Sequence, residues 1–291
     1  MEFLTGKLEV QMIRAKVNKI IDSSVVDGPG NRTAIFFQGC NFNCKYCHNP
    51  ETINHCVSCL KCVDKCPSKA LTVVDGKVLW NKDNCINCDN CIKVCTFNAS
   101  PKIQNLSVDE LLSHIKKNIP FIKGITTSGG ECTLQKDFLI ELFKETRKLG
   151  LSNFLDSNGS IRFSDYPELM EYTDAVMLDI KSIDKDEHIE LTSKSNEIVL
   201  ENAKYLASIG KLFEIRTVVI DDYLDNRKTV YEITNMLREY QKIREIRYKI
   251  IRYRHFGVRE EFSHMKAPSE EEMNNLKDIA NKNGFANVLL V

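Results

Sequence analysis

The placement of cysteine constrains this chain more than any other feature of its sequence. All 12 cysteines of the 291 residues lie at or before Cys132. The first 20 residues contain no continuous apolar stretch typical of an export signal, so we expect a cytoplasmic protein. Disulfide bonds rarely persist in that reducing compartment. Metal or cluster ligation is therefore the expected use of these thiols.

Eleven of the cysteines fall into three groups. The first group has the spacing C-x3-C-x2-C, and each of the other two has C-x2-C-x2-C-x3-C. The second and third groups form a repeat offset by 29 residues (85 − 56). The groups are Cys40, Cys44 and Cys47; Cys56, Cys59, Cys62 and Cys66; and Cys85, Cys88, Cys91 and Cys95. The remaining Cys132 is predicted to be a small buried thiol.

The repeat is typical of ferredoxins with two [4Fe-4S] clusters, in which the fourth cysteine of each run ligates the other cluster. Two zinc sites are the alternative, but zinc ribbons separate their C-x2-C pairs by a dozen or more residues. We expect residues 51–103 to form a ferredoxin-like insert, because so short a segment needs clusters in place of a core. The predicted ligand sets are Cys56, Cys59, Cys62 and Cys95, and Cys85, Cys88, Cys91 and Cys66.

The first group differs in kind, because three thiolates leave one iron of a cubane without a protein ligand. An open metal position indicates chemistry rather than structure. An apolar run, Thr33 to Phe37, leads into this loop, and Tyr46 precedes its last cysteine. This arrangement resembles the radical S-adenosylmethionine (SAM) superfamily. The resemblance implies that SAM chelates the open iron through its amino and carboxylate groups, with Tyr46 and His48 beside the adenine.

From Ser107 onward the chain alternates helix and strand. Ser107 and Glu110 form a capping box that predicts the start of a helix. Strands are expected near 124–127, 153–155, 175–178, 213–220, 246–253 and 287–291, with helices between them. This alternation predicts a parallel α/β architecture. Together with the resemblance it implies a partial (β/α)6 barrel formed by residues 16–50 and 104–291.

Polar residues follow several predicted strands, where α/β folds place their active sites. Gly129, Gly130 and Glu131 resemble the superfamily's GGE motif, which holds the SAM amino group. Arg216 lies inside an apolar strand and needs a partner, for which the SAM carboxylate and Glu131 are the candidates. The other strand-end groups are Asp156, Ser157 and Asn158, and Asp179, Ile180 and Lys181.

The resemblance adds two further predictions for SAM. In pyruvate formate-lyase activases, the stretches matching Asp156, Ser157, Met177 and Asp179 bind a monovalent cation beside the SAM carboxylate, and oxygen-rich ligation suits a hard cation. Lys181 is expected to direct positive charge toward the same carboxylate. Beyond the last long strand, Arg254 or His255 is expected to contact SAM, and the pattern leaves the choice between them open.

A glycine- and proline-containing segment ahead of the cysteine loop resembles one group within the superfamily. Asp27-Gly28-Pro29-Gly30 and Arg32 resemble glycyl radical enzyme activases, in which this segment lies against the glycine loop of the partner. VDGPG, both ferredoxin motifs, SVDE and DSNG occur in the order found in YjjW-type activases, over about residues 16 to 291. This resemblance implies reductive cleavage of SAM to a 5′-deoxyadenosyl radical, which abstracts hydrogen from a glycine of a glycyl radical enzyme.

Charge and hydropathy exclude other classes. The 40 basic and 40 acidic residues balance, which argues against a nucleic-acid partner. No apolar run approaches the roughly 18 residues of a membrane span. Seven basic residues between Lys242 and Arg259 suggest a docking face for an acidic flavodoxin or ferredoxin donor, with a solvated surface as the plainer explanation.

Two other functions remain as alternatives. A radical SAM enzyme with C-terminal auxiliary clusters is disfavoured, because no cysteine follows Cys132. A ferredoxin-type electron carrier would explain eight cysteines but neither the first group nor the GGE segment.

Overall fold

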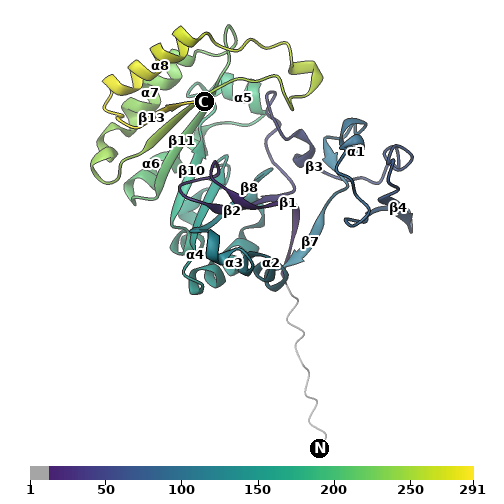
Figure 1. Ribbon diagram of the computed structural model, residues 1–291. Coiled ribbons are helices and arrows are strands. Elements are labelled where there is room, and N and C mark those ends of the chain that lie inside the picture. The colour runs from purple at the N-terminus through teal and green to yellow at the C-terminus, as the bar shows by residue number, and fades with distance from the viewer. Residues whose placement is uncertain (1–12) are drawn as a thin grey trace, which may run out of the picture.

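The structure is a computed structural model that describes residues 13–291; residues 1–12, which belong to the stretch inspected for an export signal, lie outside it. Its main feature is a nine-stranded sheet in the order β13-β12-β11-β10-β9-β8-β2-β1-β7 (Figure 1). The strands are β1 (Arg14–Ser24), β2 (Arg32–Phe37), β7 (Gln104–Ser107), β8 (Gly124–Gly129), β9 (Ser152–Ser157), β10 (Ala175–Asp179), β11 (Leu212–Val219), β12 (Arg247–Arg252) and β13 (Val288–Leu290).

The predicted α/β architecture is confirmed, with one difference. The strands from β2 to β13 in this sheet pair in parallel, as the alternation of helix and strand predicts. The two strands at the other edge, β1 and β7, were not predicted and pair antiparallel, so the sheet is mixed. Charged residues interrupt the apolar pattern of β1, and β7 has only four residues, so neither gives a clear periodic signal.

Helices connect the parallel strands and cover one face of the sheet (Figure 1). The capping box of Ser107 and Glu110 is present at the start of α2, as predicted. The α-helices are α2 (Val108–Lys116), α3 (Lys136–Lys148), α4 (Pro167–Tyr172), α5 (Lys185–Thr192), α6 (Glu197–Ser208), α7 (Asn226–Leu237) and α8 (Glu270–Lys282). Single 3-10 turns are η1 (Pro50–Thr52), η2 (Ile119–Phe121), η3 (Cys132–Gln135), η4 (Phe163–Asp165), η5 (Arg238–Lys242) and η6 (Glu260–Phe262). Among residues 13–291, none of the helices has the length and apolar character that crossing a bilayer requires.

Side chains alternate between the two faces of each strand. Leu155, Val176 and Leu178 belong to the large core shared with the helices, whereas Phe154 and Met177 belong to a separate apolar cluster. An irregularity in β11 skips one residue, since Val176 pairs with Leu212 but Met177 pairs with Glu214. The register then aligns Asp156, Met177, Glu214 and Arg247 across four adjacent strands. The face away from the core therefore carries a row of polar side chains.

Residues 54–100 lie apart from this sheet, at the right of Figure 1. They form β3 (Asn54–His55) paired with β6 (Ala99–Ser100), the hairpin of β4 (Leu71–Val74) and β5 (Lys77–Trp80), and α1 (Asn90–Lys93). The β3–β6 pair joins the two ends of the segment. Between 56 and 98 the buried hydrophobic residues are only Cys62, Ala70 and Leu71. Protein side chains alone give this segment almost no core.

Arg32 lies inside the protein, which corrects its predicted place on a partner-facing loop. Only 1% of Arg32 is exposed, and its guanidinium lies 4.1 Å from the centre of the Phe154 ring. It donates hydrogen bonds to the Thr126 hydroxyl, the Ile125 carbonyl and two oxygens of Ser152. Burial lowers its pKa to about 10. Thr126 in turn donates to the Asp27 carbonyl. Arg32 therefore anchors the Asp27–Gly30 turn from the protein interior, through Thr126.

Replacing Arg32 by Met should destabilise the protein by about 3 kcal/mol, because it leaves several buried oxygen atoms without donors. Urea unfolding under anaerobic conditions measures this loss. The matched control is Arg162→Met, since Arg162 is half-exposed and its pair with Glu201 lies at the surface. Equal loss in both variants would contradict the anchoring role.

Candidate functional site

The first cysteine group lies in a loop directly after β2. At the start of the loop, the Cys40 backbone nitrogen donates a hydrogen bond to the carbonyl of Ile53, the residue after η1, at 2.9 Å. The middle of the loop is bonded to the end of α5, through Asn43 N to the Thr192 carbonyl and Lys45 N to the Leu191 carbonyl. Cys44 is buried, and Cys40 and Cys47 are partly buried. Backbone contacts on two sides therefore fix the loop without using its thiols.

Glu131 joins this loop to the end of β9. The residue is 1% exposed, and its carboxylate accepts hydrogen bonds from Thr133 N, Thr133 Oγ1, Ser157 Oγ and Asn158 N at 2.6–3.1 Å. The Asn158 amide then donates to the Cys40 sulfur at 3.7 Å. Both carboxylate oxygens are occupied inside the protein. Direct contact between Glu131 and the SAM amino group stays a prediction.

The glycines ahead of Glu131 allow two strand ends to touch. A Cβ at Gly129 would lie 2.2 Å from the Phe37 nitrogen, and one at Gly130 would lie 2.2 Å from the Gly39 carbonyl oxygen. Gly130 N donates to the Phe37 carbonyl, and Glu131 N donates to the Gly39 carbonyl. The GGE segment is thus a backbone clamp on the start of the cysteine loop.

The thiols of this loop are neutral when no cluster is bound. Burial, helped by Glu131, raises the pKa of Cys40 to about 12, and burial raises the pKa of Cys47 to about 11. Burial also raises the pKa of Cys44, against the opposing charge of Lys181. The three thiols belong to one short loop, residues 40–47. Three such sulfurs fit a cluster whose iron charge replaces the released protons.

Lys181 places a buried positive charge beside the loop, and its predicted role toward the SAM carboxylate stays a prediction. Its ammonium lies 2.9 Å from Asp179 and 5.4 Å from the centre of the Tyr46 ring. Burial lowers the pKa of Lys181, but the carboxylate of Asp179 outweighs this, so the pKa is well above its ordinary value. Lys181 therefore stays protonated next to the cysteines.

Arg216 pairs with two acidic residues of the sheet and not with Glu131, and its contact with the SAM carboxylate stays a prediction. Its guanidinium contacts Asp156 at 2.9 Å and Glu214 at 2.5 Å, and it lies 3.0 Å from the Met177 sulfur. The expectation of Glu131 as its protein partner is wrong, because the Glu131 carboxylate is bonded to the β9 end. Burial lowers the pKa of Arg216, but Asp156 and Glu214 raise it above its ordinary value.

Three of the four predicted ligands of a monovalent cation lie on one face of the sheet, and the fourth does not. Asp156, Met177 and Asp179 lie on the polar face, where Arg216 and Lys181 supply the positive charges that the two carboxylates need. The Ser157 hydroxyl donates instead to Glu131. A bound monovalent cation stays a prediction.

The remaining predicted contacts lie around the loop or in the core. His48 Nε2 donates to the Arg254 carbonyl at 3.1 Å, while the Arg254 side chain is exposed. His255 is also exposed and donates to the Ser263 carbonyl. Ile180 is fully buried in the core. Arg259, which the sequence showed only as one of several basic residues, contacts the cysteine loop directly.

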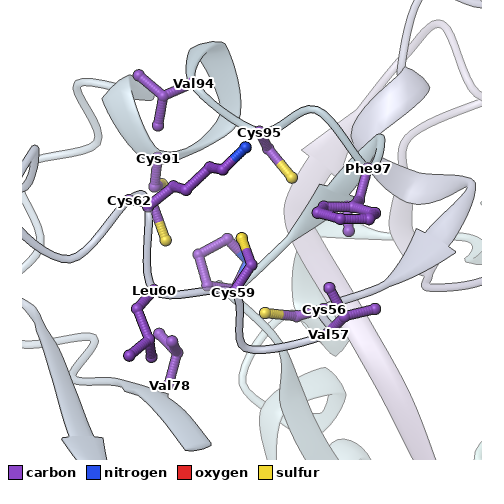
Figure 2. A pocket seen from close by; sticks show the side chains of 13 residues that line it. Cys56, Val57, Cys59, Leu60, Cys62, Val78, Cys91, Val94, Cys95 and Phe97 are labelled. Carbon is purple, nitrogen blue, oxygen red and sulfur yellow. The ribbon is translucent and has the colours of Figure 1, made fainter.

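The other eight cysteines surround two hollows in residues 54–101. One is lined by Cys56, Cys59, Cys62, Cys91 and Cys95, and Figure 2 shows sulfurs pointing into it. The other is lined by Cys66, Cys85, Cys88 and Cys91. Each hollow thus includes the three leading cysteines of one motif and the last cysteine of the other, and Cys91 lines both hollows. Among residues 13–291, no group of three or more His, Cys, Asp or Glu converges as ligands of a single metal ion do.

The backbone of this segment repeats with the same offset of 29 residues as its cysteines. Left-handed φ angles occur at three positions of the first motif and recur at the matching positions of the second. The pairs are Ser58 and Asn87, Leu60 and Asp89, and Lys69 and Asn98. Such angles are unfavourable for residues other than glycine. The two motifs therefore share one strained loop conformation.

Comparison with known proteins identifies the family. The model of the radical SAM superfamily matches residues 34–237. This chain belongs to that superfamily. It is 30% identical to the trans-4-hydroxy-L-proline dehydratase activating enzyme of Clostridioides difficile, over 90% of this chain and 94% of that protein. It is 27% identical to the pyruvate formate-lyase-activating enzyme of Clostridium pasteurianum, over 85% of each chain.

A solved structure supports the fold. A radical SAM methyltransferase from Sphaerobacter thermophilus matches with a TM-score of 0.52 at 12% identity, covering 89% of this chain and 66% of that one. Membership of the superfamily implies a [4Fe-4S] cluster and SAM. The three neutral thiols beside Lys181 fit that pair of groups.

Replacing Glu131 by Gln should weaken SAM binding about tenfold, or about 1.4 kcal/mol. The amide nitrogen cannot accept a hydrogen bond, so one buried donor on Ser157, Asn158 or Thr133 is left unpaired and the β9 end moves. Binding is measured by titrating SAM into the reconstituted protein. Glu141→Gln on the exposed side of α3 is the control. Unchanged affinity in Glu131→Gln would rule out this role.

Proposed function

We propose that this protein is a glycyl radical enzyme activating enzyme. The observation that carries the proposal is a buried three-cysteine loop in a radical SAM fold whose relatives, matched along almost the whole chain, are named activating enzymes. When bound, a reduced [4Fe-4S] cluster supplies one electron that cleaves SAM, and the resulting 5′-deoxyadenosyl radical takes a hydrogen atom from a glycine of the partner enzyme.

The residues of the chain bind and orient rather than transfer protons. Cys40, Cys44 and Cys47 would hold three irons, and Lys181 would attract the SAM carboxylate. The polar face of β9 to β12, with Asp156 and Arg216, would bind the rest of SAM. Fixed orientation and exclusion of water let the radical meet only its target hydrogen.

The auxiliary cysteines support a ferredoxin-like insert over residues 51–103 with two further [4Fe-4S] clusters. The exchange of the fourth cysteine between the two hollows supports it, as does the repeated loop conformation. The near absence of a protein core between 56 and 98 indicates that the clusters also hold the segment together. With the motif order of the sequence, this insert favours a YjjW-type activase, with barrel residues 16–50 and 104–291.

The partner is a glycyl radical enzyme, and its glycine loop would lie against Asp27–Gly30, which Arg32 supports from inside. Val25 and Val26, immediately before this turn, are 75% and 69% exposed, so the segment presents apolar surface for a protein contact. A flavodoxin or ferredoxin would supply electrons. The stretch from Lys242 to Arg259 is a weaker docking candidate than its sequence suggests, because Lys242, Arg244, Arg247 and Arg259 are engaged within the chain.

The decisive experiment is anaerobic mixing of the reconstituted protein, SAM and dithionite with candidate glycyl radical enzymes. A glycyl doublet in the EPR spectrum is the expected result with one of them. Cys44→Ser should abolish both the doublet and 5′-deoxyadenosine formation while leaving the auxiliary clusters. Efficient SAM cleavage with no doublet from any candidate would contradict the activase function and favour another radical SAM reaction.

A second experiment separates two roles of the auxiliary clusters. We expect a variant with Cys59→Ala and Cys88→Ala to become sensitive to proteolysis between 56 and 98 but to cleave SAM with dithionite. If the clusters also relay electrons, cleavage driven by a flavodoxin should be lost. Full activity with both reductants would exclude the relay and leave only the structural role.

A further inference from the structure

Arg259 connects the chain after β12 to the centre of the cysteine loop. Its Nη2 donates to the Cys44 carbonyl at 3.0 Å and lies 3.4 Å from the Asn43 carbonyl. These contacts join residues more than 200 positions apart in the sequence. The side chain is 12% exposed, and its guanidinium lies 4.7 Å from the centre of the Phe262 ring. Its only carboxylate neighbour, among the described residues, is the exposed Glu261 at 3.5 Å.

The segment that carries Arg259 is fixed to the same loop at a second point. His48 donates to the Arg254 carbonyl. Gly257 has a φ of +83°, and a Cβ there would lie 2.7 Å from the His48 carbonyl oxygen, so only glycine allows this approach. Residues 254–259 therefore pack against the cysteine loop, and Arg259 is the charged residue of this segment that contacts the loop.

One hydrogen-bond donor of Arg259 is not used in the described part of the chain. Its Nε is buried and has no hydrogen-bond partner within residues 13–291. A buried donor without a partner is costly unless another group satisfies it.

We propose that Arg259 is a positioning residue that holds Asn43 and Cys44 in place and raises the reduction potential of the cluster on Cys40, Cys44 and Cys47. This inference rests on the proposed function, because it requires that cluster. A fixed positive charge stabilises the reduced cluster, which carries one more negative charge than the oxidised one. One guanidinium nitrogen, Nη2, contacts both neighbouring carbonyls while the planar group packs against the Phe262 ring, and a flexible lysine side chain lacks that planar packing.

The test compares Arg259→Gln, Arg259→Lys and the control Arg238→Gln, an exposed arginine on η5. The reduction potential is followed by EPR, using the cluster signal that changes when SAM is added. Cluster loss to a chelator is followed by visible absorbance. Arg259→Gln should shift the potential to a more negative value and lose the cluster several-fold faster. Arg259→Lys should restore the potential but only part of the resistance to the chelator, and Arg238→Gln should match the unmodified protein.

Other results would contradict the role of Arg259 or the proposed function. An unchanged potential in Arg259→Gln would overturn the proposal, as would a potential in Arg259→Lys equal to that of Arg259→Gln. If Arg259→Gln does not fold, the Arg259→Lys result alone decides, through chelator resistance against the control. If the unmodified protein assembles no SAM-responsive cluster, the proposed function itself fails, which is a different result from a normal cluster that Arg259 does not affect.

Discussion

The buried carboxylate of Glu131 is the interaction on which the site depends. An ionised carboxylate inside a protein is unfavourable unless its oxygens are fully hydrogen-bonded. Here four donors from Thr133, Ser157 and Asn158 meet that need. The same residue clamps Gly39 through its backbone nitrogen. Displacement of any one of these strand ends would leave buried hydrogen-bonding groups without partners, so the ends of β2, β8 and β9 are fixed together.

The second constraint is the register of the parallel strands. Because β9 to β12 align Asp156, Met177, Glu214 and Arg247, each carboxylate on this face lies next to a guanidinium. Asp179 is similarly paired with Lys181. The acidic groups are thus neutralised inside the protein. Near Cys44, Lys181 is held in its pair with Asp179, whereas Arg259 has only the exposed Glu261 as a carboxylate neighbour among residues 13–291, which suits a cluster that gains an electron.

The segment from 56 to 98 is not stabilised by a hydrophobic core as the main sheet is. It has few buried apolar residues, and it repeats left-handed angles at residues such as Leu60 and Asp89. The hydrophobic effect gives little stabilisation here, so the loop conformations must be held by something else. The proposed auxiliary clusters would supply this stabilisation, because metal–ligand bonds contribute directly to folding free energy.

Much of this protein follows from its sequence. Cysteine spacing, strand alternation and the capping box are local patterns, and they predicted the main strands, the cysteine groups and the strand-end residues near the loop. The sequence did not predict β1 and β7, the inward direction of Arg32, the pairing of Arg216 or the contact of Arg259. These depend on which face a side chain takes and on which distant segment lies opposite. The sequence alone determined which groups can bind a cluster, because ligand chemistry and spacing are local. Only the tertiary structure decided which charges lie beside the cysteine loop, because those contacts join distant segments, more than 200 positions apart for Arg259 and Cys44.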